Sequence, residues 1–475
     1  MLLNPWLNMA LVLAFLLGLM VVLRIVQHRF SPHPELIRKG LHIPMGLMTL
    51  TFPWLFNQPL PVFILAGLAI AWLSILRSYT PLKTTLGNVL GGVKRRSLGE
   101  IYFPLSVALL FALSEGDPLL FCIPMLILTL ADAVAAVVGV HYGKLRYAAT
   151  DGQKSAEGSI TFFMLAFFSV HVPLLLMTNT GRAETLLIAM ILGLLVMVLE
   201  AIAWSGLDNL FIPLGGFILL KTHLEMDVTA LLIRFVVTVI LVSFVLIWRR
   251  RTTLNDSALL GAAFIGYLSW SLGGWQWLMA PLILLVSYPF LIMWIDQHKT
   301  PLTPLERQVM IWLPAEPNTQ VDFTPTRQWE RVHNVYAVLS VAAGGLLWLA
   351  LYRLTNDPSF IYPYTLAFAS NLSVICIAGL SPVHYWQKNN WLRVIAYICE
   401  SWLLMFVPLI IVASGSTASL LSSALSLLGI AIAAIAYYLT QPMLRQRPTD
   451  TLNWLCRAVY TTLGSGVVLI SLFTR

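Results

Sequence analysis

The amino-acid sequence predicts an all-α protein, a polytopic transmembrane helical bundle of about 14–16 spans in two halves. Two observations lead to this fold class. Of the 475 residues, 58% are hydrophobic and only 11% are charged, and the mean hydropathy is +0.81. A water-soluble chain of this length carries more charge on its surface. Apolar runs of about 20 residues also recur along the chain, each long enough to cross a hydrocarbon core about 30 Å thick.

The hydropathy pattern places the helix starts in order along the chain. They lie near residues 6, 38, 60, 101, 119, 157, 183, 208, 229, 257, 276, 332, 360, 392, 418 and 454. The first run has no basic leading segment and no small-residue cleavage site, so we expect a retained helix and not a signal peptide. The run near residue 208 is only about 14 residues long and contains Pro213, which is typical of a re-entrant or broken helix.

Lysine and arginine gather between the spans. Four basic groups, in residues 24–39, 77–96, 144–154 and 249–251, fall on one side of the membrane if the chain starts outside. The positive-inside rule makes that side the cytoplasm. The rule also explains the net charge of +8 without a nucleic-acid partner. We therefore expect an integral, multi-pass membrane protein surrounded by membrane lipids.

A charged break at residues 249–255 separates two transmembrane halves, residues 1–252 and residues 253–475. The second half contains one long polar segment, about residues 297–331, which we expect to be a cytoplasmic connection. Charged residues inside apolar runs are costly and usually functional. Most of them lie in the first half, toward the cytoplasmic ends of the spans.

The first charged cluster is Arg38, Lys39 and His42, at the start of the second span. Arg38 and His42 are four residues apart and share one face of a helix. A basic pair beside an imidazole at this depth suits a phosphate or diphosphate ligand. The alternative is that the cations only reach the membrane interface, with His42 bonded to a neighbouring helix.

The second cluster begins at Asp132, a bare carboxylate in an apolar helix. Such a carboxylate needs a cation, and Mg²⁺ that holds a nucleotide phosphate is the natural one. Phosphate ligands then follow along the chain. Those expected to hold the nucleotide are Gly139, Gly143, Lys144, Lys154, Ser155, Glu157, Gly158 and Ser159, the last four at the start of the next helix. The alternative reading of the glycines, spaced four residues apart, is close helix packing, but packing does not explain Asp132 or Glu157.

The third cluster is Glu200, at the end of an apolar span, with Asp208 and Asn209 after it. The expected cytoplasmic position of Asp132, Glu200 and Asp208 would let them converge on one or two metal ions. Alternatively, Asp208 is only a helix N-cap.

Taken in order, these clusters resemble the membrane prenol and lipid kinases: phytol kinase, dolichol kinase, the CTP-dependent diacylglycerol kinase and, more distantly, CDP-diacylglycerol synthase. The matching motifs are Arg-Lys-x-x-His at 38–42, Arg-Ser-Leu-Gly-Glu at 96–100, the block at 132–159, and Glu200 with Leu-Asp-Asn-Leu at 207–210. Asp208 and Asn209 with Pro213 following favour the phytol and dolichol kinases. Ala133 departs from the usual pattern, because it contributes no hydroxyl.

The resemblance implies a CTP-dependent kinase that phosphorylates a membrane lipid alcohol, such as phytol or a polyprenol, at the cytoplasmic face of a bacterial inner (plasma) membrane. Its cofactors would be Mg²⁺ and CTP. Asp132, Glu200 and Asp208 would hold the metal or orient the nucleophile, and His42 would accept the hydroxyl proton. Arg38, Lys39 and Asn209 would join the nucleotide site. The sequence does not specify an oligomeric state.

The second half resembles a diverged phytyl-phosphate kinase. Residues 257–261 and 273–275 match that family's opening, but the stretch from Phe368 to Ser373 has Asn371 where the family has an acid. We therefore expect this half to be non-catalytic. Two rival functions stay open: a phosphatidate cytidylyltransferase-like enzyme, and a transporter or scaffold, although a transporter more often has ionisable residues near the midplane.

Overall fold

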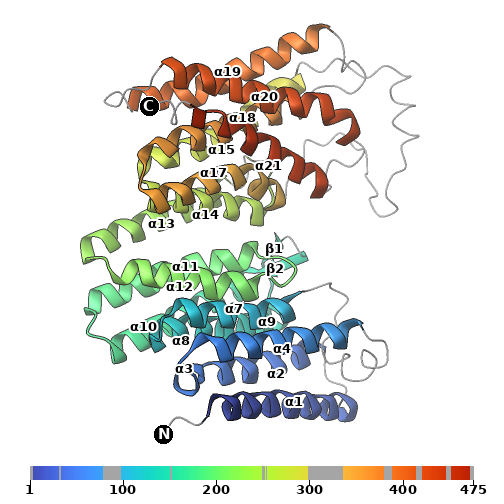
Figure 1. Ribbon diagram of the computed structural model, residues 1–475, viewed down its shortest axis with the longest axis vertical. Coiled ribbons are helices and arrows are strands. Elements are labelled where there is room, and N and C mark those ends of the chain that lie inside the picture. Colours follow the sequence, from blue (N-terminus) through green and yellow to red (C-terminus); the bar gives the residue numbers. More distant parts are fainter. Residues whose placement is uncertain are drawn as a thin grey trace. The chain divides into compact units, whose positions relative to one another are not determined.

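The computed structural model describes residues 4–30, 34–78, 98–149, 152–248, 252, 254–297, 335–378, 388–412, 420–444 and 451–470. Over these residues the chain is helical apart from one two-stranded hairpin (Figure 1). Ten of the described helices are long and apolar enough to cross a membrane, and two shorter helices are also apolar. The all-α transmembrane fold class is therefore confirmed.

The chain divides into two compact units, Met1–Ser243 and Phe244–Arg475. The first unit contains α1 (Pro5–Phe30), α2 (Pro34–Thr49), α3 (Phe52–Leu55), α4 (Pro59–Ser78), α7 (Gly99–Leu113), α8 (Pro118–Leu126), the π-helical turn η1 (Ile127–Ala131), α9 (Asp132–Tyr142), β1 (Arg146–Ala149), β2 (Gly152–Ser155), α10 (Ala156–Met177), α11 (Arg182–Ile202), α12 (Asp208–Leu224) and most of α13 (Val228–Trp248).

The second unit is built around one central helix. Its elements are α14 (Asp256–Gly273), α15 (Trp275–Gln297), α17 (Val335–Thr355), the 3-10 turn η2 (Pro358–Phe360), α18 (Ile361–Ala378), α19 (Lys388–Val412), α20 (Leu420–Leu444) and α21 (Thr451–Gly466). Helix α18 packs against α15, α17, α19, α20 and α21, and its side chains are almost entirely buried. Asn371 in its middle donates to the carbonyl oxygens of Val341 and Ala367, which is a structural role.

The hydropathy pattern located the helices well. Each of the sixteen expected starts lies within about one helical turn of the first residue of a described helix. The expectation of a broken helix near residue 208 is wrong, because α12 is one continuous helix of 17 residues that passes through Pro213. That the helix is re-entrant stays a prediction. Helices α7, α8 and α11 pack around α12, and such neighbours allow a proline inside a membrane helix.

The span that carries Asp132 is not a uniform α-helix. Helix α8, the turn η1 and helix α9 form one apolar span of 25 residues, Pro118–Tyr142. Asp132 is the first residue after the π-helical turn. A π turn shifts the direction of the side chains that follow it and is frequent at functional sites.

Helix α2 approaches η1 closely because Gly46 has no side chain. A Cβ atom on Gly46 would lie only 2.8 Å from the Cβ of Thr129, and its contact with the Thr129 hydroxyl would be closer still. This approach places the earlier turns of α2, which carry Lys39 and His42, against η1 and the start of α9.

We expect the substitution Gly46→Ala to separate α2 from η1 and to lower the free energy of unfolding by about 1–3 kcal/mol, as overpacking does in a close-packed interior. Gly67→Ala is the matched control, since a Cβ atom at Gly67 meets nothing within 4 Å. Thermal unfolding in detergent, followed by tryptophan fluorescence, compares the two variants. Equal unfolding temperatures would show that the Gly46 contact does not position α2.

Candidate functional site

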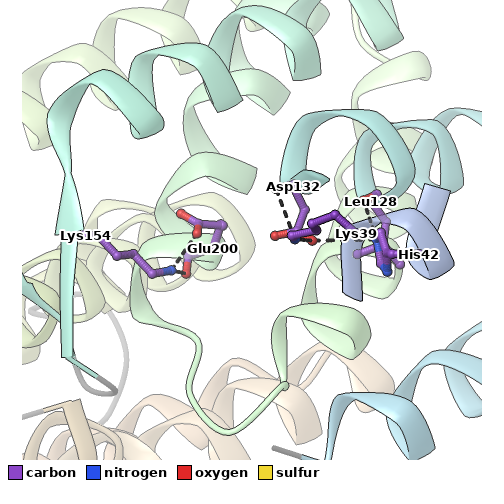
Figure 2. A network of polar contacts seen from close by, with 6 residues as sticks. All are labelled: Lys39, His42, Leu128, Asp132, Lys154 and Glu200. Carbon is purple, nitrogen blue, oxygen red and sulfur yellow. Dashed lines mark hydrogen bonds and ion pairs between the residues drawn. The ribbon is translucent and has the colours of Figure 1, made fainter. Parts of the chain in front are cut away.

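A buried ion pair joins α2 to α9. Lys39 Nζ lies 2.6 Å from Asp132 Oδ2 and also donates to the backbone carbonyl oxygen of Asp132 at 3.3 Å. The two side chains are only 4% and 11% exposed. The Asp132 carboxylate was expected to need a cation, and the protein itself supplies one. That cation is the ammonium group of Lys39, which was expected to bind a phosphate (Figure 2).

His42 lies beside this pair, one turn after Lys39 on the same face of α2. Its Nε2 atom is 3.6 Å from Asp132 Oδ2 and 3.1 Å from the carbonyl oxygen of Leu128 in η1. A carbonyl oxygen only accepts, so Nε2 carries a hydrogen, and Nδ1 is the basic nitrogen of the neutral ring. Phe103 of α7 packs edge-on against the imidazole, with the ring centroids 5.7 Å apart.

A second ion pair joins β2 to the end of α11. Lys154 Nζ lies 2.6 Å from Glu200 Oε1 and also donates to the backbone carbonyl oxygen of Glu200. Both side chains are largely buried. Figure 2 shows Lys154 and Lys39 reaching their carboxylates from opposite sides of the view, with Glu200 and Asp132 between them.

Lys154 lies in β2, outside the membrane-spanning helices. Burial alone would lower its pKa, but the charge and hydrogen bond of Glu200, with help from Tyr147 and Asp208, raise the pKa above its usual value. Lys154 therefore remains a charged donor at physiological pH. The stabilisation that this shift contributes is fully present below the ordinary lysine pKa and is lost only as the pH rises through the raised value.

The position of Lys154 comes from a hairpin that the sequence reading missed. Strands β1 and β2 are antiparallel, with Tyr147 directly opposite Lys154. The Tyr147 hydroxyl forms a 2.8 Å hydrogen bond with Ser159 Oγ, which ties the hairpin to the first turn of α10. The polar stretch Thr-Asp-Gly at residues 150–152, rich in turn-forming residue types, is the sequence signal that favours a tight turn here.

A tight turn between α11 and α12 brings Asp208 close to Glu200. Gly206 in this turn has a φ of 88°, a conformation that favours glycine. Leu98 N–H donates to the Ser205 carbonyl oxygen at 2.8 Å and so joins the segment before α7 to the turn. The N-cap of α12 is Leu207, with no side-chain bond, and Asp208 is the first helical residue. The alternative that Asp208 acts only as an N-cap is therefore wrong.

Two buried oxygen atoms at the start of α12 have no hydrogen-bond partner among the described residues. They are Oδ1 of Asp208 and Oδ1 of Asn209. The charge of Asp208 acts on both Lys154 and Glu200, so this end of α12 belongs to the same polar site. A buried carboxylate oxygen without a partner is costly, and a cation or a hydroxyl donor would satisfy it.

The glycines of the second cluster have a clear packing role. A Cβ atom on Gly143 would lie 2.7 Å from Ser155 Cβ, and one on Gly139 would lie 3.1 Å from Ser155 Oγ. On Gly158 it would lie 3.1 Å from the carbonyl oxygen of Ala135. These glycines let α9 and α10 meet around Ser155, and their contact with a nucleotide stays a prediction.

The start of α10 is partly occupied by the protein itself. Ser155 is the N-cap, and its hydroxyl accepts from Gly158 N–H at 3.2 Å, while Ala156 N–H donates to the Leu145 carbonyl oxygen. The Glu157 carboxylate accepts from Leu145 N–H at 3.2 and 3.3 Å. The backbone N–H groups of Ala156 and Gly158, which were expected to bind an anion, therefore already donate to atoms of the protein. Lys144 is exposed, and its charge acts on Glu157.

The three acids expected to hold metal lie near one another without forming a closed metal site. Asp132 and Asp208 are both within electrostatic reach of Glu200. Within the described part of the chain, no three His, Cys, Asp or Glu side chains are placed to hold one metal ion. Asp132 and Glu200 are paired with lysines instead. The Arg38 side chain and residues 79–97, which include the basic stretch at 94–97, lie outside the described residues.

Comparison with known proteins finds a phytol kinase of Synechocystis sp. that is similar to this chain. The two are 32% identical over 214 residues, which make up 44% of this chain and 89% of that protein. No protein-family model matches the chain. No solved structure matches it either.

A double-mutant cycle should show strong coupling between Lys39 and Asp132. Lys39→Met removes the ammonium group that contacts the buried Asp132 carboxylate and should cost about 3–5 kcal/mol of stability. Adding Asp132→Leu removes the carboxylate as well. The double variant should therefore lose less stability than the two single variants lose in sum. Unfolding in detergent measures all three variants.

The control cycle uses the exposed pair Lys221 and Glu115, whose charged atoms are 3.8 Å apart. Its coupling energy should stay below about 1 kcal/mol. If the stability losses of the Lys39 and Asp132 variants are additive, the buried pair does not hold α2 against α9.

Proposed function

Because the chain belongs to the phytol kinase family, we propose that it is a kinase that phosphorylates a membrane lipid alcohol of the prenol type. The relative named phytol kinase, matched over most of its length, supports this class of reaction. The single observation that carries the proposal is the buried polar site of the first unit. There, two lysines and three carboxylates are brought together by α2, α9, β2, α11 and α12.

The donor set of this site fits Mg²⁺. Mg²⁺ prefers oxygen ligands and in kinase sites uses one or two carboxylates, with substrate phosphates and water as the remaining ligands. The unpartnered Asp208 oxygen and the nearby carboxylates of Glu200 and Asp132 provide such oxygens without a three-residue cage. When bound, Mg²⁺ would neutralise charge on the phosphates.

Phosphoryl transfer requires placement and charge neutralisation more than covalent chemistry by the protein. The alcohol oxygen forms a bond to the γ-phosphorus, and the bond from that phosphorus to the bridging oxygen breaks, so the nucleoside diphosphate leaves with the electron pair. Lys39 and Lys154 hold the phosphates. The Leu128 carbonyl oxygen fixes the His42 ring, and His42 Nδ1 accepts the hydroxyl proton.

The finer features of the proposal rest on the residues and on the family resemblance. We propose CTP as the donor, phytol or a polyprenol as the acceptor, and the cytoplasmic face of a bacterial inner membrane as the location. The basic segments between the spans support the cytoplasmic face. We assign catalysis to residues 1–252, because both buried lysine–carboxylate pairs lie there, whereas Asn371 of the second unit donates its amide N–H groups to backbone carbonyl oxygens.

The direct test incubates purified protein with Mg²⁺ and CTP labelled either at the γ-phosphate or in the cytosine ring. The acceptors are phytol, a polyprenol, diacylglycerol and phosphatidate, and ATP replaces CTP in parallel reactions. We expect the γ-label, and not the cytosine label, to appear in a prenyl phosphate. Cytosine label in a lipid made from phosphatidate would instead identify a cytidylyltransferase.

Asp132→Asn should lower the transfer rate by about 10²–10³-fold, the size of effect that follows the loss of one preorganised electrostatic contribution to a transition state. Lys221→Met is the control and should transfer phosphate at the wild-type rate, because the Lys221 ammonium lies beside exposed Glu115 and the Phe217 ring and not among the residues of the candidate site. Membrane insertion of both variants is checked by detergent extraction. A fully active Asp132→Asn enzyme would remove Asp132 from the metal site.

His42→Gln should lower kcat by about 10²–10⁴-fold with little change in the KM for CTP, because the imidazole acts on the hydroxyl proton in the transition state. Steady-state rates at varied CTP and varied alcohol separate the two constants. A raised KM for CTP with unchanged kcat would show that His42 contacts the nucleotide and is not the base.

A further inference from the structure

The two ion pairs of the site have the same construction. In each, the lysine Nζ contacts a carboxylate oxygen at 2.6 Å and also the backbone carbonyl oxygen of the same acidic residue. Lys39 does this with Asp132, and Lys154 does it with Glu200. The pairs come from four different elements, α2, α9, β2 and α11, so the repetition does not follow from a local sequence pattern.

Each pair combines a natural metal ligand with a natural phosphate ligand. Carboxylates are the protein groups that Mg²⁺ prefers, and lysine ammonium groups bind phosphates. In the protein alone these groups neutralise one another. Metal and phosphate therefore compete with contacts that the site already makes.

We propose that the two pairs are internal counter-ions that exchange partners when metal and nucleotide bind together. The Asp132 and Glu200 carboxylates turn to the metal, and the Lys39 and Lys154 ammonium groups turn to the phosphates. This inference rests on the proposed function, because it requires a metal-bound nucleotide as the substrate. Its consequence is that neither the metal nor the nucleotide binds tightly without the other.

The physical reason is the cost of a buried unpaired charge. A metal ion that arrives alone competes with a buried ammonium group for the same carboxylate, and displacing Lys39 would leave its charge without a partner. A triphosphate that arrives alone would draw the lysines away and leave two bare carboxylates. When both arrive, every charge in the site keeps an opposite charge at contact distance.

The backbone carbonyl contacts make the exchange feasible. An ammonium group has three donors, and the carbonyl oxygens of Asp132 and Glu200 keep one of them after the carboxylate turns away. The lysines therefore stay in place while their other donors reach phosphate oxygens. The flexible four-carbon stem of lysine allows this small movement, which the rigid fork of arginine would not.

The test measures metal affinity of the purified full-length protein in detergent, without a lipid alcohol. Mn²⁺ replaces Mg²⁺ because its electron paramagnetic resonance signal reports the free ion. In wild type, CTP should tighten Mn²⁺ binding by about 5–150-fold, after correction for Mn²⁺ bound by CTP in solution. Mn²⁺ should tighten CTP binding by the same factor, as linkage requires.

Lys39→Met and Lys154→Met should each tighten the binding of Mn²⁺ alone and reduce its coupling to CTP. Lys39→Gln and Lys154→Gln repeat the test with an amide that still donates to the backbone carbonyl, in case a methionine variant does not fold. Lys221→Met, at the exposed pair with Glu115, should match wild type in both measurements.

Failure of the exchange and failure of the proposed function give different results. Wild type that transfers phosphate, but binds Mn²⁺ equally with and without CTP, would overturn the exchange and leave the kinase assignment standing. The same conclusion follows if the lysine variants bind Mn²⁺ alone no better than wild type does. Absence of label transfer from CTP or ATP to any lipid alcohol would overturn the kinase assignment, and the exchange with it.

Discussion

The buried ion pair between Lys39 and Asp132 is the interaction on which the site depends. A carboxylate inside an apolar span is tolerated only with a partner, and the partner comes from a helix far away in the sequence. The pair therefore fixes how α2 meets α9. Gly46 makes the meeting sterically possible, and η1 places both Asp132 and the Leu128 carbonyl oxygen where α2 reaches them. Packing and charge thus act on the same contact.

The first unit contains buried ion pairs, whereas the polar contacts described in the second unit join mostly neutral groups. In the second unit the Tyr364 hydroxyl contacts Ser269 and the Trp277 carbonyl oxygen, and Asn371 binds two backbone carbonyl oxygens. Such bonds stabilise a helix bundle. Buried polar atoms without a described partner occur in both units, for example Asp208 Oδ1 in the first and Ser370 Oγ in the second, but in the first unit they include a carboxylate oxygen. The buried carboxylates and lysines of the first unit are therefore the structural argument for placing the proposed reaction there.

The candidate site was partly predictable from the sequence. Charge in or beside an apolar run is costly, and this cost identified five residues of the site: Asp132, Glu200, Asp208, Lys39 and Lys154. The sequence did not show which of them form pairs, since the same five residues are compatible with an open metal site. The helix expected to break at Pro213 is continuous, and the hairpin that presents Lys154 was read as a loop despite the turn-forming residue types at 150–152. In both cases the prediction used the residue types of one segment and left out the elements that pack against it.

A helical membrane protein could be recognised from the sequence, together with the starts of its helices and the charged residues that need an explanation. Hydropathy and the cost of buried charge are properties of single segments, so one sequence is enough to show them. Which charges meet became visible in the folded chain. Lys39 and Asp132 are 93 residues apart, and Lys154 and Glu200 are 46 apart. Their contact depends on how helices pack, which no local pattern specifies.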